Sequence, residues 1–211
     1  MTKSKNNLIL KPGEKLTISG RNGSGKTQFA DFIVRRADGY WIILDQKHDD
    51  TLEKLAKPVT SFKDVENWLK KPNSKFCVFR PKTSDPEIID EWIFDLSERS
   101  KNIGLYIDEL YYVMRNGQAG RGLQGWLTRG RSRKQSFIGI TQRPKRVSLF
   151  CFSEADFIAQ FFLTLVDDRQ RIYEFIGRDI VKENPPLRYS FRYYDVKRDE
   201  LTTFGPITIR K

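Results

Sequence analysis

An eight-residue segment near the start of this chain matches the phosphate-binding pattern G-x-x-x-x-G-K-[ST] and reads Gly20-Arg21-Asn22-Gly23-Ser24-Gly25-Lys26-Thr27. Such a segment works between a strand and a helix, because the backbone N–H groups of its turn must point at the phosphates. Residues 16–19 alternate like a short strand, and residues 28–34 have the apolar spacing of a helix. The sequence therefore predicts a fold built around a strand, a phosphate-binding loop and a helix.

The chemistry of the same segment predicts its ligand. Lys26 is placed to reach the β- and γ-phosphates of a nucleoside triphosphate, and the Thr27 hydroxyl is placed to bind Mg²⁺. We therefore expect ATP and Mg²⁺ as cofactors, with Thr27 as a metal ligand. The residues expected to bind ATP are Gly20, Arg21, Asn22, Gly23, Ser24, Gly25, Lys26, Thr27 and Gln28.

Apolar strands alternate with helical stretches along most of the chain, which is typical of a mostly parallel α/β sheet flanked by helices. At 84–87 a capping residue, a proline and a glutamate indicate the start of a helix. The expected strands after the first are 40–44, 76–79, 103–107, 137–140 and 157–162, and the expected helices after the first are 62–71 and 84–96.

The residue pattern of the sequence changes after Gly177. Residues 188–194 and 201–204 alternate at period two, which predicts an antiparallel β-hairpin added to the sheet. We expect a single domain over 1–211, with the α/β core at about 15–177 and a C-terminal β extension at about 178–211.

Composition excludes several other classes. A hydrophobic content of 38% argues against disorder, and the longest apolar stretch, 157–166, is far shorter than the roughly 18 residues of a membrane span. Residues 1–7 are basic but no apolar region follows them, so no signal peptide is expected. Cys77 and Cys151 lie in apolar runs without companion ligands, which predicts buried thiols in a reducing compartment.

Positive charge is concentrated in one part of the chain. The net charge is +11, and the stretch 121–146 holds eight basic residues and no acidic one. A local field of one sign favours phosphate ligands, either those of ATP or those of a nucleic-acid backbone. The eight residues are Arg121, Arg129, Arg131, Arg133, Lys134, Arg143, Lys145 and Arg146.

A second motif predicts hydrolysis. The apolar strand 103–107 runs directly into Asp108 and Glu109. We expect Asp108 to support the Mg²⁺ ion and Glu109 to activate the attacking water. Kinases acting on small substrates need no such glutamate, so the pair favours hydrolysis. The alternative is that the two acids only cap the helix that follows.

A third motif lies at the end of the next predicted strand, where Thr141-Gln142-Arg143-Pro144 follows 137–140. Gln142 at the tip of that strand is expected to sense the γ-phosphate and help place the water. Taken alone, these four residues are also consistent with an ordinary turn before proline.

Together these motifs resemble the FtsK–HerA superfamily of ring-forming, DNA-translocating ATPases. The resemblance covers about residues 15–177 and includes the strand end Leu44-Asp45-Gln46-Lys47. It departs at Gln46, where the cellular translocases tend to have proline. The small size resembles the genome-packaging ATPases of tailless icosahedral viruses with an internal membrane. The resemblance implies a RecA-like P-loop NTPase of the ASCE group that packages double-stranded viral DNA into a preformed capsid.

The resemblance also implies partners and a location. It implies a hexameric ring with ATP between subunits, contacts with capsid portal-vertex proteins, and a place in the host cytoplasm or in the virion. An arginine of one subunit then completes the neighbouring site. The candidates are Arg129, Arg131 and Arg133, and Arg131 is favoured; the alternative for Arg131 is a contact with the DNA backbone or plain solvation. The loop between Arg115 and Arg121 is expected to face DNA in the ring.

Two rival functions are consistent with the sequence. A cellular translocase for end resection or DNA transfer would carry the same motifs, and a P-loop nucleotide kinase would share the phosphate-binding loop. A filament-extrusion ATPase is disfavoured by the lack of a membrane span. Four further residues are expected to have structural roles: His48 at the surface, and Tyr111, Tyr112 and Trp126 packed against the sheet.

Overall fold

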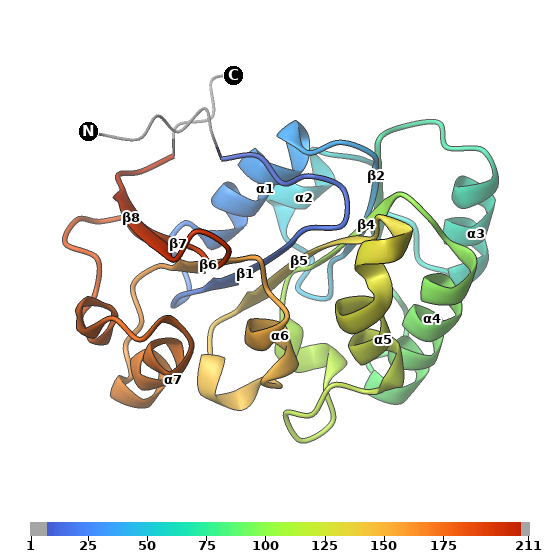
Figure 1. Cartoon of the computed structure of the whole chain (residues 1–211). Helices are drawn as coiled ribbons and strands as arrows, with labels where there is room; N and C mark the ends of the chain where they lie inside the picture. Colours follow the sequence, from blue (N-terminus) through green and yellow to red (C-terminus); the bar gives the residue numbers. More distant parts are fainter. Residues whose placement is uncertain (1–7, 208–211) are drawn as a thin grey trace.

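The frame of the molecule is an eight-stranded sheet with the strand order β3-β2-β4-β5-β1-β6-β7-β8 (Figure 1). The computed structural model describes residues 8–207. The basic segment 1–7 and the end of the predicted β extension, 208–211, lie outside the described residues. The strands are β1 Lys15–Ser19, β2 Tyr40–Leu44, β3 Phe76–Phe79, β4 Ile103–Ile107, β5 Ser136–Thr141, β6 Phe157–Gln160, β7 Phe191–Asp195 and β8 Glu200–Phe204.

Helices connect most of these strands. The α-helices are α1 Lys26–Arg36, α2 Asp50–Glu53, α3 Phe62–Lys70, α4 Pro86–Arg99, α5 Arg121–Arg129, α6 Phe150–Ser153 and α7 Val166–Ile176. The described residues also form short 3₁₀ helices: η2 Leu110–Val113, η3 Gly130–Arg133, η4 Pro144–Arg146 and η5 Asp179–Lys182. Among residues 8–207 no helix has the length and apolar character needed to cross a membrane.

The predicted fold class is confirmed. Strands β1 to β6 pair in parallel, with β1 between β5 and β6 and β4 between β2 and β5. The hairpin β7–β8 is added antiparallel to β6, as its alternating pattern predicted. It begins at Phe191 rather than Arg188, because Tyr189 has a left-handed φ of 61° and Ser190 closes a turn with Leu187.

Both faces of the sheet are covered, which explains why strands β2, β3 and β4 are apolar along their whole length. Helices α1 and α2 pack on one face, and α3 to α7 pack on the other (Figure 1). Both cysteines lie buried and unpaired, as predicted, and burial raises the pKa of each thiol to about 12.

Helix α5 is joined to α4 by a buried carboxylate. Asp90 of α4 accepts hydrogen bonds from the backbone N–H groups of Gly122 and Leu123, both at 2.9 Å. These N–H groups lie in the first turn of α5, where they have no partner within the helix. Gly122 is required by this close approach, because a Cβ there would lie 2.1 Å from the carbonyl oxygen of Asp90.

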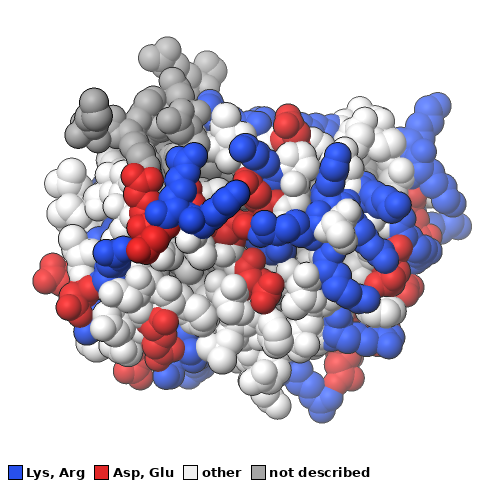
Figure 2. Space-filling view, in the orientation of Figure 1, with Lys and Arg blue, Asp and Glu red and all other residues white. Residues whose placement is uncertain are grey.

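Basic side chains are spread over one broad region of the surface. Figure 2 shows them across the upper middle and the right of the face on view, with acidic side chains among them. Several of the arginines are paired: Arg129 and Arg133 contact Glu98, and Arg131 contacts Asp156. The positive field of this region is therefore partly neutralised within the chain.

We predict that Asp90→Ala lowers the free energy of unfolding by about 2 kcal/mol, because it leaves two buried N–H groups of α5 without acceptors. Chemical denaturation followed by circular dichroism measures the change. Glu91→Ala is the matched control, since Glu91 pairs only with an exposed arginine at the surface. Equal stability of the two variants would contradict the role given to Asp90.

Candidate active site

Four loops meet at one edge of the sheet. In a parallel sheet the carboxyl ends of all strands lie at the same edge, and ligands bind there. The register aligns Ser19 of β1 with Thr141 of β5, and Leu44 of β2 with Ile107 of β4. The segments that follow these four strands begin at Gly20, Gln142, Asp45 and Asp108, so all three predicted motifs lie side by side.

The loop Gly20–Thr27 has the form that its pattern predicted. Gly23 and Gly25 have φ angles of 69° and 100°, which residues with a Cβ rarely adopt. Gly20 is required by close packing, because a Cβ there would lie 2.5 Å from Phe161 and 2.7 Å from the Ser24 hydroxyl. Helix α1 begins at Lys26, so the loop lies at the positive end of a helix dipole.

The Lys26 ammonium lies inside this loop. Its Nζ donates to the carbonyl oxygen of Arg21 at 2.7 Å, and the side chain is buried. Burial, together with the nearby charge of Lys47, lowers the pKa of Lys26 to about 8. A buried ammonium with a single carbonyl partner is poorly compensated, and a polyphosphate would supply the missing negative charge.

Asp108 of the acidic pair and Thr27 of the phosphate-binding loop contact each other. The Thr27 hydroxyl donates to Asp108 Oδ1 at 3.4 Å, and the Tyr106 hydroxyl donates to the same oxygen at 3.3 Å. The other oxygen, Asp108 Oδ2, is buried and accepts no hydrogen bond. Burial raises the pKa of Asp108. A free carboxylate oxygen beside a hydroxyl is the hard oxygen set that Mg²⁺ prefers, so these residues fit the predicted metal.

Glu109 links the second motif to the third. The backbone N–H of Gln142 donates to Glu109 Oε1 at 3.3 Å, and the Glu109 side chain is buried. The carboxylate therefore lies between the ends of β4 and β5, beside Asp108. Gln142 lies at the tip of β5, as predicted. It contacts Glu109 through its backbone N–H rather than through its side chain.

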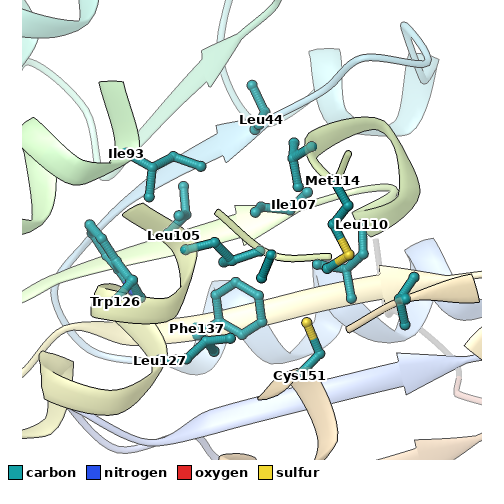
Figure 3. Packing of buried hydrophobic residues seen from close by; sticks show 14 of the residues in the cluster. Leu44, Ile93, Leu105, Ile107, Leu110, Met114, Trp126, Leu127, Phe137 and Cys151 are labelled. Atoms are coloured by element: carbon teal, nitrogen blue, oxygen red, sulfur yellow. The ribbon is translucent and has the colours of Figure 1, made fainter. Parts of the chain in front are cut away.

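The core below holds this acidic pair in position. Ile107, Leu110 and Met114 flank Asp108 and Glu109 in sequence and pack together in the same buried cluster (Figure 3). The backbone on both sides of the two acids is thus fixed by apolar contacts. The chain segment that carries the two carboxylates cannot shift away from the site without disturbing this packing.

The turn that carries Gln142 is also fixed. Asp168, which is buried in the first turn of α7, accepts from Arg143 Nε at 2.9 Å and from the backbone N–H of Lys145 at 3.1 Å. Arg143 therefore positions the turn through a contact within the chain. The proline that follows ends the strand and begins η4.

Sequence reasoning missed one residue of the site, Lys47. Its Nζ lies 3.0 Å from Glu109 Oε2 and 3.6 Å from Asp108 Oδ2. Burial by itself would lower the pKa of Lys47, but the two carboxylates raise it above its usual value. The feature of the sequence that could have identified Lys47 is its position just after β2. Because β2 pairs with β4, the end of β2 lies beside the acidic pair that follows β4.

Other predicted residues lie elsewhere. Arg129 and Arg131 are at the opposite edge of the sheet, where Arg131 contacts Asp156 next to the start of β6. Within one chain they are therefore remote from the phosphate-binding loop. Gln28 is exposed on the first turn of α1, with no hydrogen bond to the other site residues described.

The prediction that Tyr111 and Tyr112 pack in the core is wrong. They are 46% and 48% exposed, because η2 turns both rings outward while Leu110 and Val113 point inward. Trp126 is fully buried as predicted, and its indole donates to the carbonyl oxygen of Ser136. His48 lies at the surface as predicted.

We predict that Lys26→Met stabilises the nucleotide-free protein at pH 7 by about 2 kcal/mol. The lowered pKa of Lys26 corresponds to about 3 kcal/mol of destabilisation, of which the hydrogen bond lost in the variant offsets about 1 kcal/mol. The penalty is fully present below about pH 8 and fades as the pH rises towards the unfolded value of 10.5, since the folded protein then releases its proton first.

Denaturation curves of the wild type and of Lys26→Met between pH 7 and pH 10 measure this effect. The stability difference between them is expected to shrink as the pH rises. A difference that stays constant over this range, or a variant that is less stable at pH 7, would contradict the strain assigned to the buried ammonium.

Comparison with known proteins gives a consistent result. No protein-family model matches the chain. The DNA packaging ATPase P9 of Enterobacteria phage PRD1 is 29% identical to it over an alignment 205 residues long, which covers 92% of this chain and 87% of that protein.

Solved structures share the fold. The genome packaging NTPase B204 from Sulfolobus turreted icosahedral virus 2, in complex with sulfate, has a TM-score of 0.78 at 21% identity, covering 95% of this chain and 100% of that chain. Its complex with ATP-γS has a TM-score of 0.77 at 21% identity, covering 93% and 99%. VirB4 of Thermoanaerobacter pseudethanolicus has a TM-score of 0.64 at 11% identity, covering 92% and 90%. The chain is thus similar over most of its length to viral DNA packaging ATPases, and the resemblance predicted from its motifs is confirmed.

Proposed function

We propose that this protein is a genome-packaging ATPase, which hydrolyses Mg-ATP to move double-stranded viral DNA into a preformed capsid. The observation that carries the proposal is the meeting of three motifs at one edge of the sheet: the loop with Lys26, the pair Asp108-Glu109, and Gln142. The similarity to P9 and B204 supports the same function, since both are named as packaging enzymes.

Each part of the ATP site has a role set by its chemistry. The N–H groups of Gly20–Thr27 receive the phosphates, and Lys26 moves from the Arg21 carbonyl to the phosphate oxygens. Thr27 and Asp108 would hold Mg²⁺ through the hydroxyl and the free carboxylate oxygen. The ion supplies charge neutralisation for the phosphoryl group being transferred.

Glu109 would activate the attacking water. Its carboxylate is buried, lies beside Asp108 and is fixed by the Gln142 N–H at one oxygen. The other oxygen is available to accept a proton from water once Lys47 has moved away. The Gln142 backbone N–H contacts this carboxylate, and the Gln142 side chain would orient the same water.

The assembly and partners follow from the packaging role. We propose a homo-oligomeric ring, with six subunits expected, in the host cytoplasm or attached to the virion at a portal vertex. Double-stranded DNA is the substrate that is moved. The loop between Arg115 and Arg121 would touch the DNA backbone, since both arginines are exposed and phosphate contacts read no sequence.

An arginine supplied by a neighbouring subunit would complete each site. Arg131 and Arg129 are exposed at the sheet edge opposite the phosphate-binding loop, so neither reaches the site of its own subunit. A head-to-tail ring brings opposite faces of neighbours together. This placement is consistent with Arg131 acting in trans.

Glu109→Gln tests the hydrolytic role. The amide keeps the size of the side chain but cannot accept a proton, so the variant is expected to bind ATP with little change and to hydrolyse it at least a hundredfold more slowly. Equilibrium binding of a fluorescent ATP analogue and steady-state phosphate release give the two numbers. Hydrolysis at a rate close to the wild type would rule out Glu109 as the base.

Mixing of inactive subunits tests Arg131. If it acts in trans, Arg131→Ala and Lys26→Met are each inactive alone, but their mixture recovers part of the ATPase rate. The reason is that a Lys26→Met subunit still offers its Arg131 to a neighbour with an intact ATP site. Lys101→Ala, a change at an exposed basic residue nearby, is the control and should keep full activity. No recovery on mixing, with ring assembly intact, would remove Arg131 from the site.

A further inference from the structure

Lys47 places a positive charge between the two acids of the site. Its Nζ is 3.0 Å from Glu109 Oε2, 3.6 Å from Asp108 Oδ2 and 3.3 Å from the carbonyl oxygen of Asp108. The Lys47 side chain is 27% exposed, whereas the Asp108 side chain is 1% and the Glu109 side chain 7% exposed. Two buried carboxylates thus share one ammonium that reaches in from the surface.

The loop that carries Lys47 is built to hold this position. Asp45, fully buried at the end of β2, accepts from the backbone N–H of Asp49 and from Arg80 Nε at 2.8 Å. Between them His48 has a left-handed φ of 58°, which turns the chain tightly. The contacts of Asp45 therefore fix both ends of the loop 45–49. From this loop the Lys47 side chain reaches the acids that follow β4.

The ammonium and a divalent cation need the same oxygen. Asp108 Oδ2 accepts no hydrogen bond and lies 3.6 Å from the Lys47 ammonium. The same atom is the oxygen left free for Mg²⁺ in the proposed ATP site. Two cations beside the same buried oxygen repel strongly, so the metal cannot bind Asp108 Oδ2 while the Lys47 ammonium stays beside that atom.

We propose that Lys47 is a stand-in cation: it neutralises Asp108 and Glu109 in the nucleotide-free subunit and is displaced when the divalent cation arrives with ATP. The inference rests on the proposed function. It has two consequences for the site. The nucleotide-free subunit binds divalent metal poorly, because the ammonium already occupies the acidic pair. Glu109 becomes free to act as a base only after Lys47 has left it.

The test measures metal binding by the full-length, nucleotide-free protein. Mn²⁺ is the probe, and electron paramagnetic resonance counts the free ion. Lys47→Met is expected to bind Mn²⁺ at least tenfold more tightly than the wild type. It should also unfold at a lower temperature in EDTA and regain the lost stability when Mg²⁺ is added, since the metal then replaces the ammonium.

Two variants serve as controls. Lys47→Arg keeps the charge, and Lys57→Met makes the same change of charge at an exposed residue of a different loop. Both should bind Mn²⁺ as weakly as the wild type. An unchanged Mn²⁺ affinity in Lys47→Met, or a loss of its fold that Mg²⁺ does not restore, would overturn the proposal.

Failure of the proposal for Lys47 can be distinguished from failure of the proposed ATPase function. Wild-type ATP hydrolysis is measured beside the Mn²⁺ titrations. Hydrolysis with no change of Mn²⁺ affinity in Lys47→Met would reject the role of Lys47 alone. Tighter Mn²⁺ binding by Lys47→Met, together with a wild-type protein that hydrolyses no ATP, would reject the enzyme and leave the cation exchange standing.

Discussion

Two adjacent carboxylates buried at the end of a central strand are the constraint on which this site depends. Asp108 and Glu109 follow β4 and are fixed from below by apolar residues of η2 and the segment after it. Burying such a pair is costly unless cations meet it. Among the described residues, two ammonium groups lie near them. Lys47 contacts both acids, and Lys26 lies close enough for them to raise its pKa against the effect of burial.

Two charged groups of the site are thus incompletely compensated by their neighbours. Lys26 is an ammonium with too little negative charge around it, and Asp108 has an oxygen with no hydrogen bond. In the proposed function Mg-ATP would correct both, because its phosphates would meet Lys26 and its metal would meet Asp108. We propose that these two mismatched charges favour binding of the metal together with the nucleotide over either component alone.

Much of this arrangement was predictable from the sequence, because it depends on local patterns. The loop Gly20–Thr27 carries its own geometry in its glycines, and Asp108-Glu109 follows a strand that is apolar throughout. The role of Lys47 was not predictable in this way, since it depends on β2 pairing with β4, a contact between segments about 60 residues apart. The exposure of Tyr111 and Tyr112 was missed because a 3₁₀ turn there replaces the expected packing.

The central claim is that this site drives work on DNA, and the ATPase rate with and without DNA tests it most directly. Linear double-stranded DNA of unrelated sequences is expected to stimulate phosphate release several-fold, to similar extents, because backbone contacts are blind to sequence. A rate that ignores DNA, together with transfer of phosphate to an added nucleoside, would contradict the account and identify a kinase instead.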